Sequence, residues 1–128
     1  MGFFPFGAAG NGVLAATPAA GFPLQNNANV VILAWTAPAD GKIHFVNLTA
    51  QMYVTAGPQV GGQVNLWFTE PLGNFQSRQM IAGSNAAGFA PQTTVNGFAV
   101  APGQTVQVVQ TVAQTAGTAS LWAVLTGG

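Results

Sequence analysis

Very few side chains of this protein could take part in chemistry. The charged residues are Asp40, Lys42, Glu70 and Arg78, and His44 is the single histidine. Asp40 and His44 lie four residues apart and would need a serine to form a catalytic triad. Neither lies next to a nucleophile motif such as G-x-S-x-G, and positions four apart on a strand share a face but are well separated along it. We interpret them as turn and strand-start residues and expect no enzymatic activity.

The sequence also lacks the residues that metal, phosphate or nucleic-acid binding would need. A metal site takes three or four ligands, whereas this chain offers one imidazole, two scattered carboxylates and no cysteine. The glycine-rich stretch GPQVGG at residues 57–62 lacks the lysine of a phosphate-binding loop. Two basic residues supply too few phosphate contacts for nucleic-acid binding. We expect no cofactor, no metal and no nucleic-acid partner.

Aromatic side chains are the remaining functional candidates. Trp35, Trp67 and Trp122, together with Tyr53 and many amides, could form a sugar-binding surface, because aromatic rings stack on sugars and amides bond hydroxyls. Trp67 and Trp122 each share strand parity with polar neighbours, so at least one should leave the core of its own subunit. Tryptophans in strands more often fill a core or an interface. We interpret Trp67 and Trp122 as interface residues and keep carbohydrate binding as the alternative.

Glycine and proline turns divide the chain into the strands that must position these side chains. No stretch shows the 3.6-residue period of a helix. In the strand KIHFVNLTAQMYV, apolar residues from Val46 to Val54 alternate with mostly polar ones, while Ile43 and Phe45 have the opposite parity. That change predicts a bulge or a change of burial near Val46. Strands are expected at residues 29–36, 42–54, 63–69, 75–81, 93–100, 105–113 and 118–126.

This pattern predicts an all-β fold. Short turns join most of the strands, and the small, polar residues 82–92 form a long connection of the kind that crosses between sheets in a Greek key. We therefore expect an antiparallel β-sandwich of jelly-roll type with seven or eight strands. The sandwich should span residues 29–128, and residues 1–28 should form an extended N-terminal arm and loop.

The composition predicts that other subunits cover part of the surface. Only 3% of residues are charged, the net charge is zero and the mean hydropathy is +0.39. A folded monomer of this mass exposes roughly 6,000 Å², of which a soluble protein normally has about a quarter charged. The longest apolar run, VVILAW at residues 30–35, has the length of a strand and not of a membrane-spanning helix. The amino end lacks the basic and apolar regions of a secretory signal.

The amino-terminal stretch MGFFPFGAAGNG contains Phe3, Phe4 and Phe6 before any charged residue. It is too short and too rich in glycine for a stable helix. Three phenylalanines can bury on the order of 450 Å², which favours docking on another surface. We interpret these three residues as interface residues that contact a neighbouring subunit or an underlying shell.

Four stretches between residues 29 and 126 resemble small jelly-roll proteins of bacteriophage virions. They are APADGKIHF, LWFTEPLGNFQ, VAPGQTVQVV and TAGTASLWAVL. The family includes head-decoration or cement proteins and fibre domains. The resemblance implies a trimer of jelly rolls, similar in plan to complement-globular and tumour-necrosis-factor-like folds, bound to a larger shell. It transfers no catalytic or binding residue, and this chain is poorer in charge than most such proteins.

Together these features predict a structural virion protein. It would be a capsid decoration or cement subunit, located in the virion, that forms a homotrimer and contacts the major capsid protein through apolar surfaces. No membrane contact is expected. The alternative is a carbohydrate- or receptor-binding β-sandwich module, lectin-like or from a fibre.

Overall fold

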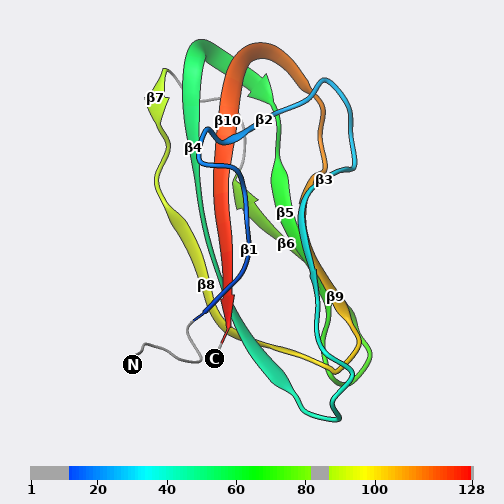
Figure 1. Cartoon of the computed structure of the whole chain (residues 1–128). Coiled ribbons are helices and arrows are strands. Elements are labelled where there is room, and N and C mark those ends of the chain that lie inside the picture. Colours follow the sequence, from blue (N-terminus) through cyan, green and yellow to red (C-terminus); the bar gives the residue numbers. More distant parts are fainter. Residues whose placement is uncertain (1–11, 82–86, 128) are drawn as a thin grey trace, which may run out of the picture.

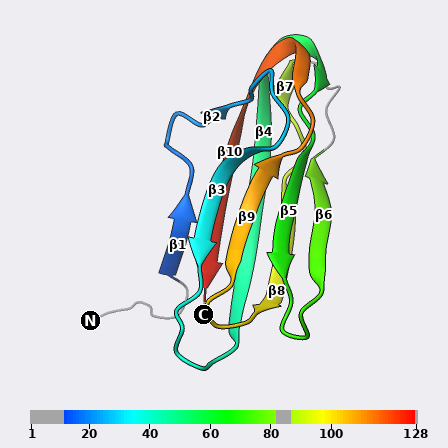
Figure 2. The ribbon, with the colours of Figure 1, turned by 90° about the vertical axis from the view of Figure 1, so that its right-hand side faces the viewer.

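The computed structural model describes residues 12–81 and 87–127, which form an antiparallel β-sandwich of two sheets. Figure 1 shows the two layers side by side, and Figure 2 shows the second sheet face on. The strands are β1 (Gly12–Ala16), β2 (Phe22–Pro23), β3 (Val30–Thr36), β4 (His44–Gly61), β5 (Val64–Thr69), β6 (Phe75–Ile81), β7 (Gly88–Phe89), β8 (Thr93–Val100), β9 (Thr105–Gln110) and β10 (Gln114–Gly127).

The predicted jelly-roll-type sandwich is confirmed by the strand order, and the described residues form ten strands where seven or eight were expected, because the short strands β1, β2 and β7 are additional. The six-stranded sheet is built on the β10–β4 pair, with β1 and β2 on the free side of β10 and with β7 and β8 on the free side of β4. The four-stranded sheet has the order β3-β9-β5-β6. The chain passes from one sheet to the other between β6 and β8, as expected for residues 82–92. Residues 82–86 of this connection lie outside the described residues.

Strands β4 and β10 form the longest pairing in the molecule. Their register runs without interruption from Ala119 opposite Val54 to Gly127 opposite Val46. The side chains of both strands alternate between the core and the outer face, as the β-strand period requires. Leu121 opposite Met52 is fully buried, and its chain neighbour Trp122 lies on the outer face. One pairing therefore positions the core and the outer surface of the sheet.

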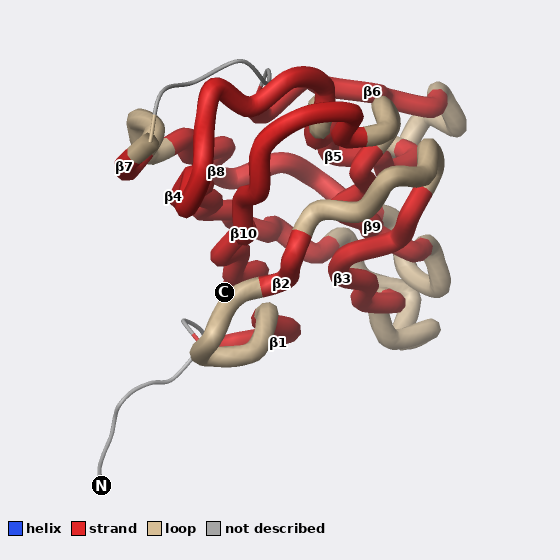
Figure 3. Tube along the Cα trace, turned by 90° about the horizontal axis from the view of Figure 1, so that it is seen from above, coloured by secondary structure: helices blue, strands red, loops and turns tan. Residues whose placement is uncertain are grey.

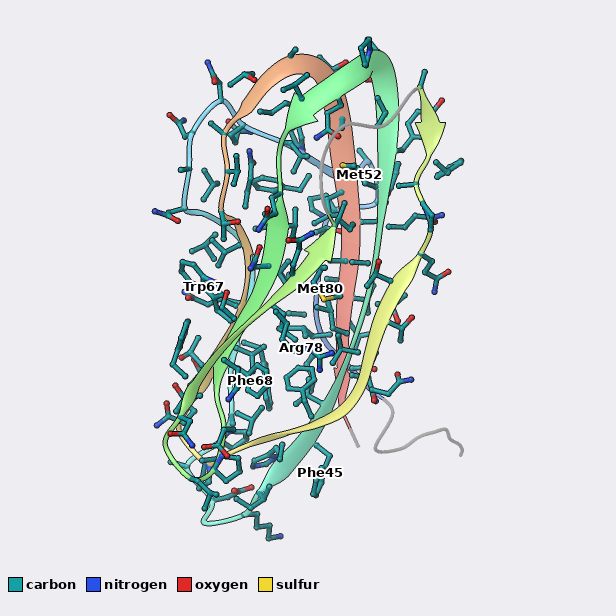
Figure 4. The ribbon with its side chains drawn as sticks, turned by 180° about the vertical axis from the view of Figure 1, so that it is seen from behind. Phe45, Met52, Trp67, Phe68, Arg78 and Met80 are labelled. Carbon is teal, nitrogen blue, oxygen red and sulfur yellow. The ribbon has the colours of Figure 1, made fainter. Side chains whose placement is uncertain are left out.

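The core lies between the two sheets and is entirely apolar at its centre. Val46, Leu48, Met52, Leu66 and Phe68 are buried, as the alternation of the sequence predicts. Phe68 from the four-stranded sheet packs on Phe98 from the six-stranded sheet, with ring centroids 4.7 Å apart. Figure 4 shows Phe68, Met52 and Met80 between the sheets, with Trp67 pointing away from them. This contact between sheets fixes which face of each strand is external.

Strand β4 differs from the sequence prediction at both of its ends. Residues 57–61, expected as part of a turn, continue β4, because Val60 and Gly61 pair with Ala116 and Gln114 of β10. At the other end β4 begins at His44, two residues later than expected, and Ile43 and Phe45 are exposed, which confirms a change of burial near Val46. The register of β4 against β8 also shifts between Val46 and Leu48, so the ladder is irregular at this point, as the change of parity predicts.

Buried glutamines occupy the end of the sandwich where β4 and β10 bend toward the second sheet, which Figure 3 shows from above. The side chain of Gln110 accepts from the backbone N–H of Gln25 and donates to its carbonyl oxygen, at 2.8 and 2.6 Å. Gln59 donates to the side chain of Gln114 at 3.1 Å. These bonds satisfy polar groups that would be costly to bury alone, although the Oε1 atom of Gln59 has no hydrogen-bond partner among the described residues. They also connect both sheets at this end.

Strands β1 and β2 lie within residues 1–28, the range expected to be an arm and loop. Both pair with β10, so residues 12–16 and 22–23 extend the six-stranded sheet. Gly12 lies opposite Gly127, which lies opposite Val46 of β4. The described chain therefore begins at the end of the sandwich that holds Phe45. Phe3, Phe4 and Phe6 lie outside the described residues.

Close backbone packing where β10 crosses β4 leads to a stability prediction. Gly117 and Gly103 both have positive φ, 73° and 79°, so alanine at either position costs about 1–2 kcal/mol in backbone strain. A methyl group at Gly117 would also lie 2.6 Å from the carbonyl oxygen of Ala56, whereas one at Gly103 meets nothing within 4 Å. In urea unfolding we expect Gly117→Ala to lose about 3 kcal/mol or more. Equal losses for the two variants would contradict this packing.

Candidate functional site

Asp40 and His44 are joined in the turn that leads into β4. The Nε2 atom of His44 lies 2.9 Å from Oδ1 of Asp40, and the backbone N–H of Lys42 donates to the same oxygen at 3.0 Å. The expectation that the two side chains are well separated is therefore wrong, because Asp40 belongs to the turn and not to the strand. These bonds, first that from His44, lower the pKa of Asp40. In the described part of the chain, the hydrogen bonds of the His44 ring involve Asp40 alone.

Two further charged side chains, those of Glu70 and Arg78, lie on the β5–β6 hairpin, apart from Asp40 and His44. Glu70 closes the β5–β6 hairpin by accepting from the backbone N–H of Asn74 at 2.8 Å. Arg78 is exposed on β6, on the side of that strand that faces the other sheet (Figure 4). Residues 12–81 and 87–127 contain no group of three or more acidic, histidine or cysteine side chains that could hold a metal ion. The same residues contain no helix suited to crossing a membrane.

An apolar surface covers the outer side of the β5–β6 hairpin. We call Trp67, Leu72 and Phe75 the hairpin patch. Leu72 is 88% exposed and Phe75 is 61% exposed. The rings of Trp67 and Phe75 meet edge to face, with centroids 5.9 Å apart. Trp67, predicted to be an interface residue, is therefore outside the core of its own subunit and packs against Phe75, and Leu72 lies in the turn of the same hairpin.

Hydrogen bonds hold the ring of Trp67 against the sheet. Its Nε1–H donates to Oγ of Ser77 at 2.9 Å, and Asn65 donates to the same oxygen at 3.1 Å. Asn65 is itself buried and accepts from Thr111 and Gln63, both at 3.0 Å. Because the polar edge of the indole is already bonded, its apolar surface is what remains for a partner.

A second aromatic cluster lies on the outer face of the six-stranded sheet. We call Tyr53, Phe89 and Trp122 the platform. The ring centroids of Tyr53 and Phe89 are 4.6 Å apart, and that of Trp122 lies 6.3 Å from Tyr53 and 6.2 Å from Phe89. Phe89 is 67% exposed, while Tyr53 and Trp122 are half-buried. The platform and the hairpin patch therefore lie on opposite outer faces of the sandwich.

The loop between β1 and β2 fits closely around Trp122. The Nε1–H of Trp122 donates to the carbonyl oxygen of Ala19 at 2.9 Å. A methyl group at Gly21 would lie 3.2 Å from the indole ring, in a residue whose φ is 86°. Glycine at this position lets the backbone approach the ring closely. The orientation of Trp122 is thus fixed by residues that precede the expected sandwich domain.

The structure does not gather the three tryptophans into one surface. Trp67 belongs to the hairpin patch and Trp122 to the platform. Trp35 is half-buried against the core, and its ring meets His44 edge to face at 6.0 Å. The prediction that at least one of Trp67 and Trp122 leaves the core is confirmed for both. The interface role of these two residues stays a prediction.

Sequence reasoning missed Phe75, Leu72 and Phe89 as surface residues. Phe75 begins β6 with outward parity, and Leu72 is in the turn EPLGN, so their positions alone indicate exposure. Phe89 falls within the long connection that the sequence predicts for residues 82–92. In the structure it lies opposite Tyr53 in the short strand β7. That pairing joins distant segments and has no local signal.

The charged residues are confined to one part of the molecule. Asp40 and Lys42 are in the β3–β4 turn, Glu70 is in the β5–β6 turn and Arg78 is on β6. The described strands of the six-stranded sheet contain no aspartate, glutamate, lysine or arginine. The platform is therefore surrounded by neutral groups.

Comparison with protein-family models, curated proteins and solved structures finds no match for this chain.

The Asp40–His44 contact leads to a prediction about pH. The pKa of Asp40 is lowered from its ordinary value of 3.8, so its ionised form stabilises the fold above that pH. This contribution is lost as the pH falls through the lowered pKa. We expect the melting temperature to change little between about pH 5 and pH 9 and to fall below about pH 4. The acid-induced fall should be smaller in Asp40→Asn, measured by calorimetry. A steep change near pH 7 in both proteins would contradict this prediction.

Proposed function

We propose that this protein is a structural virion subunit, a capsid decoration or cement protein that packs through apolar contacts. It associates with copies of itself as a trimer and with the major capsid protein. The observation that supports this most directly is the hairpin patch. Leu72 and Phe75 are large, apolar and highly exposed, and the indole of Trp67 packs against Phe75. Exposed apolar surface on one hairpin indicates a contact with another protein.

The scarcity of charge supports the same proposal. The accessible surface of the chain is 6149 Å², and four charged side chains are available to cover it. Charge keeps most soluble proteins apart from one another, and a net charge near zero promotes association. A subunit that is surrounded by neighbours does not need that protection.

The first described residue lies at the same end of the sandwich as the turn of the hairpin patch. The described chain starts at Gly12, near the end of the sandwich that holds Ile43 and Phe45. Figure 1 shows that the β3–β4 and β5–β6 turns are at this end as well. In our proposal Phe3, Phe4 and Phe6 contact the neighbouring subunit or the shell here.

The trimer and the virion rest on the resemblance of four turn-and-strand stretches to phage jelly-roll proteins. A mechanical role needs no reaction centre, and the close ionisable pair of Asp40 and His44 stabilises a turn. The function would be to add buried area that a shell must lose before it can open.

Removal of the hairpin patch should abolish self-association. We expect Leu72→Ser with Phe75→Ser to convert the trimer to a monomer in sedimentation velocity, because two exposed apolar side chains lose their hydrophobic contribution. The circular dichroism spectrum should not change, since both residues lie outside the core. Phe89→Ser is the matched control and should leave the trimer intact.

A monomeric wild-type protein would contradict the proposed trimer. Dissociation by the control to the same degree would show that the hairpin patch is not the contact. For the shell partner, protein lacking residues 1–11 should fold but fail to cosediment with shells that the full chain decorates. Undiminished binding of the truncated protein would contradict the role of the arm.

A further inference from the structure

We propose that the platform formed by Tyr53, Phe89 and Trp122 binds a neutral oligosaccharide. This activity goes beyond the structural role and uses the face opposite the hairpin patch. The three rings come from strands β4, β7 and β10, and the shortest distance between their centroids is 4.6 Å. They form one continuous aromatic surface made of segments that are far apart in the sequence. Sugar rings have an apolar C–H face that stacks on such surfaces.

Polar side chains surround the aromatic rings on the same outer face. Gln51 lies opposite Trp122 in the β4–β10 pairing, and Ser120 lies opposite Tyr53. Beyond them Thr55 and Thr118 bond to each other through their hydroxyls at 2.7 Å. Amides and hydroxyls donate and accept hydrogen bonds in the way that sugar hydroxyls require. Aromatic faces with such a border fit a carbohydrate.

The absence of charge defines the class of sugar. The strands of the six-stranded sheet contain no acidic or basic residue other than His44, which is at the far end of β4 from the platform. A phosphorylated, sulfated or uronic-acid ligand would lose part of the hydration of its charged group on binding. Since the platform offers no opposite charge, this desolvation would cost free energy. Neutral hexoses and N-acetylhexosamines do not incur this cost.

Two groups of this face, Trp122 and Gln51, are held in place by the protein itself. Trp122 is held by its bond to Ala19 and by the close approach of Gly21. The side chain of Gln51 donates to the carbonyl oxygen of Ala90 at 3.0 Å, which fixes the amide next to the rings. Preorganised groups lose little conformational freedom on binding, so even a small contact can be specific.

A second copy of the chain could occupy the platform in place of a sugar. The two outer faces differ in how well they suit such a protein contact. The hairpin patch includes the aliphatic side chain of Leu72, which is 88% exposed in the β5–β6 turn, as a protein contact favours. The side chains near the platform include four polar ones, those of Gln51, Ser120, Thr55 and Thr118. This border favours a hydroxyl-rich ligand over an apolar protein surface.

Binding can be tested with four neutral probes, namely cellohexaose, chitohexaose, maltohexaose and mannohexaose, with hexagalacturonate as the charged control. The protein has three tryptophans, so ¹⁵N-labelled protein gives three indole N–H signals, of which Trp122→Phe identifies one. We expect at least one neutral probe to shift the Trp122 signal at millimolar concentration. The signal of Trp67 should stay in place, and hexagalacturonate should shift neither.

Two exposed phenylalanines provide matched variants for calorimetry with the same probe. Phe89→Ala should weaken binding about tenfold or more, as truncation of a central contact does. Phe75→Ala removes a ring of similar exposure from the hairpin patch and should leave the affinity unchanged. Both residues are on the surface, so both variants should keep the fold.

The proposal is overturned if no neutral probe shifts the Trp122 signal at millimolar concentration. It is also overturned if Phe75→Ala weakens binding as much as Phe89→Ala, or if hexagalacturonate binds as well as the neutral sugars. Loss of trimer formation in Phe89→Ala would assign the platform to self-association instead. The oligomeric state of Leu72→Ser with Phe75→Ser tests the structural role separately.

Discussion

The pairing of β4 with β10 is the interaction on which the rest of this structure depends. Its uninterrupted register places Leu121 opposite Met52 in the core and, one residue away, Trp122 on the outer face. A shift by one residue would move every side chain to the opposite face. The other strands of the six-stranded sheet pair with one of these two, and both strands bend at their upper end toward the second sheet (Figure 1). Core, sheet order and platform therefore all depend on this register.

The two outer faces of this charge-poor sandwich differ in the kind of surface they expose. On the hairpin patch, bonds from Trp67 and Asn65 to Ser77 leave only apolar surface for a partner. On the opposite face, aromatic rings alternate with amides and hydroxyls. The exposed Arg78 on the edge strand β6 follows a pattern that limits unwanted edge-to-edge pairing. We propose that the apolar surface contacts protein and that the neutral polar surface binds sugar.

Much of the fold follows from local signals in the sequence. The alternation from Val46 to Val54 predicts one buried face, and the bounds of β6 and β8 were predicted to the residue. Strands β1 and β2 were missed because they depend on pairing with β10, which is about 100 residues away. The continuation of β4 through residues 57–61 was read as a turn because glycine and proline are common there. Phe89 joins the platform through its pairing with Tyr53, which no local pattern shows.

The central claim is that the two outer faces have different partners, and amide hydrogen exchange tests it most directly. Exchange is measured by mass spectrometry on the wild-type protein below and above the concentration at which it assembles. The account predicts that peptides covering residues 70–76 become protected on assembly, while peptides covering residues 53, 89 and 122 do not. Addition of a neutral oligosaccharide should then protect the second set and leave the first unchanged. Protection of the platform on assembly, or no protection of residues 70–76, would contradict the account.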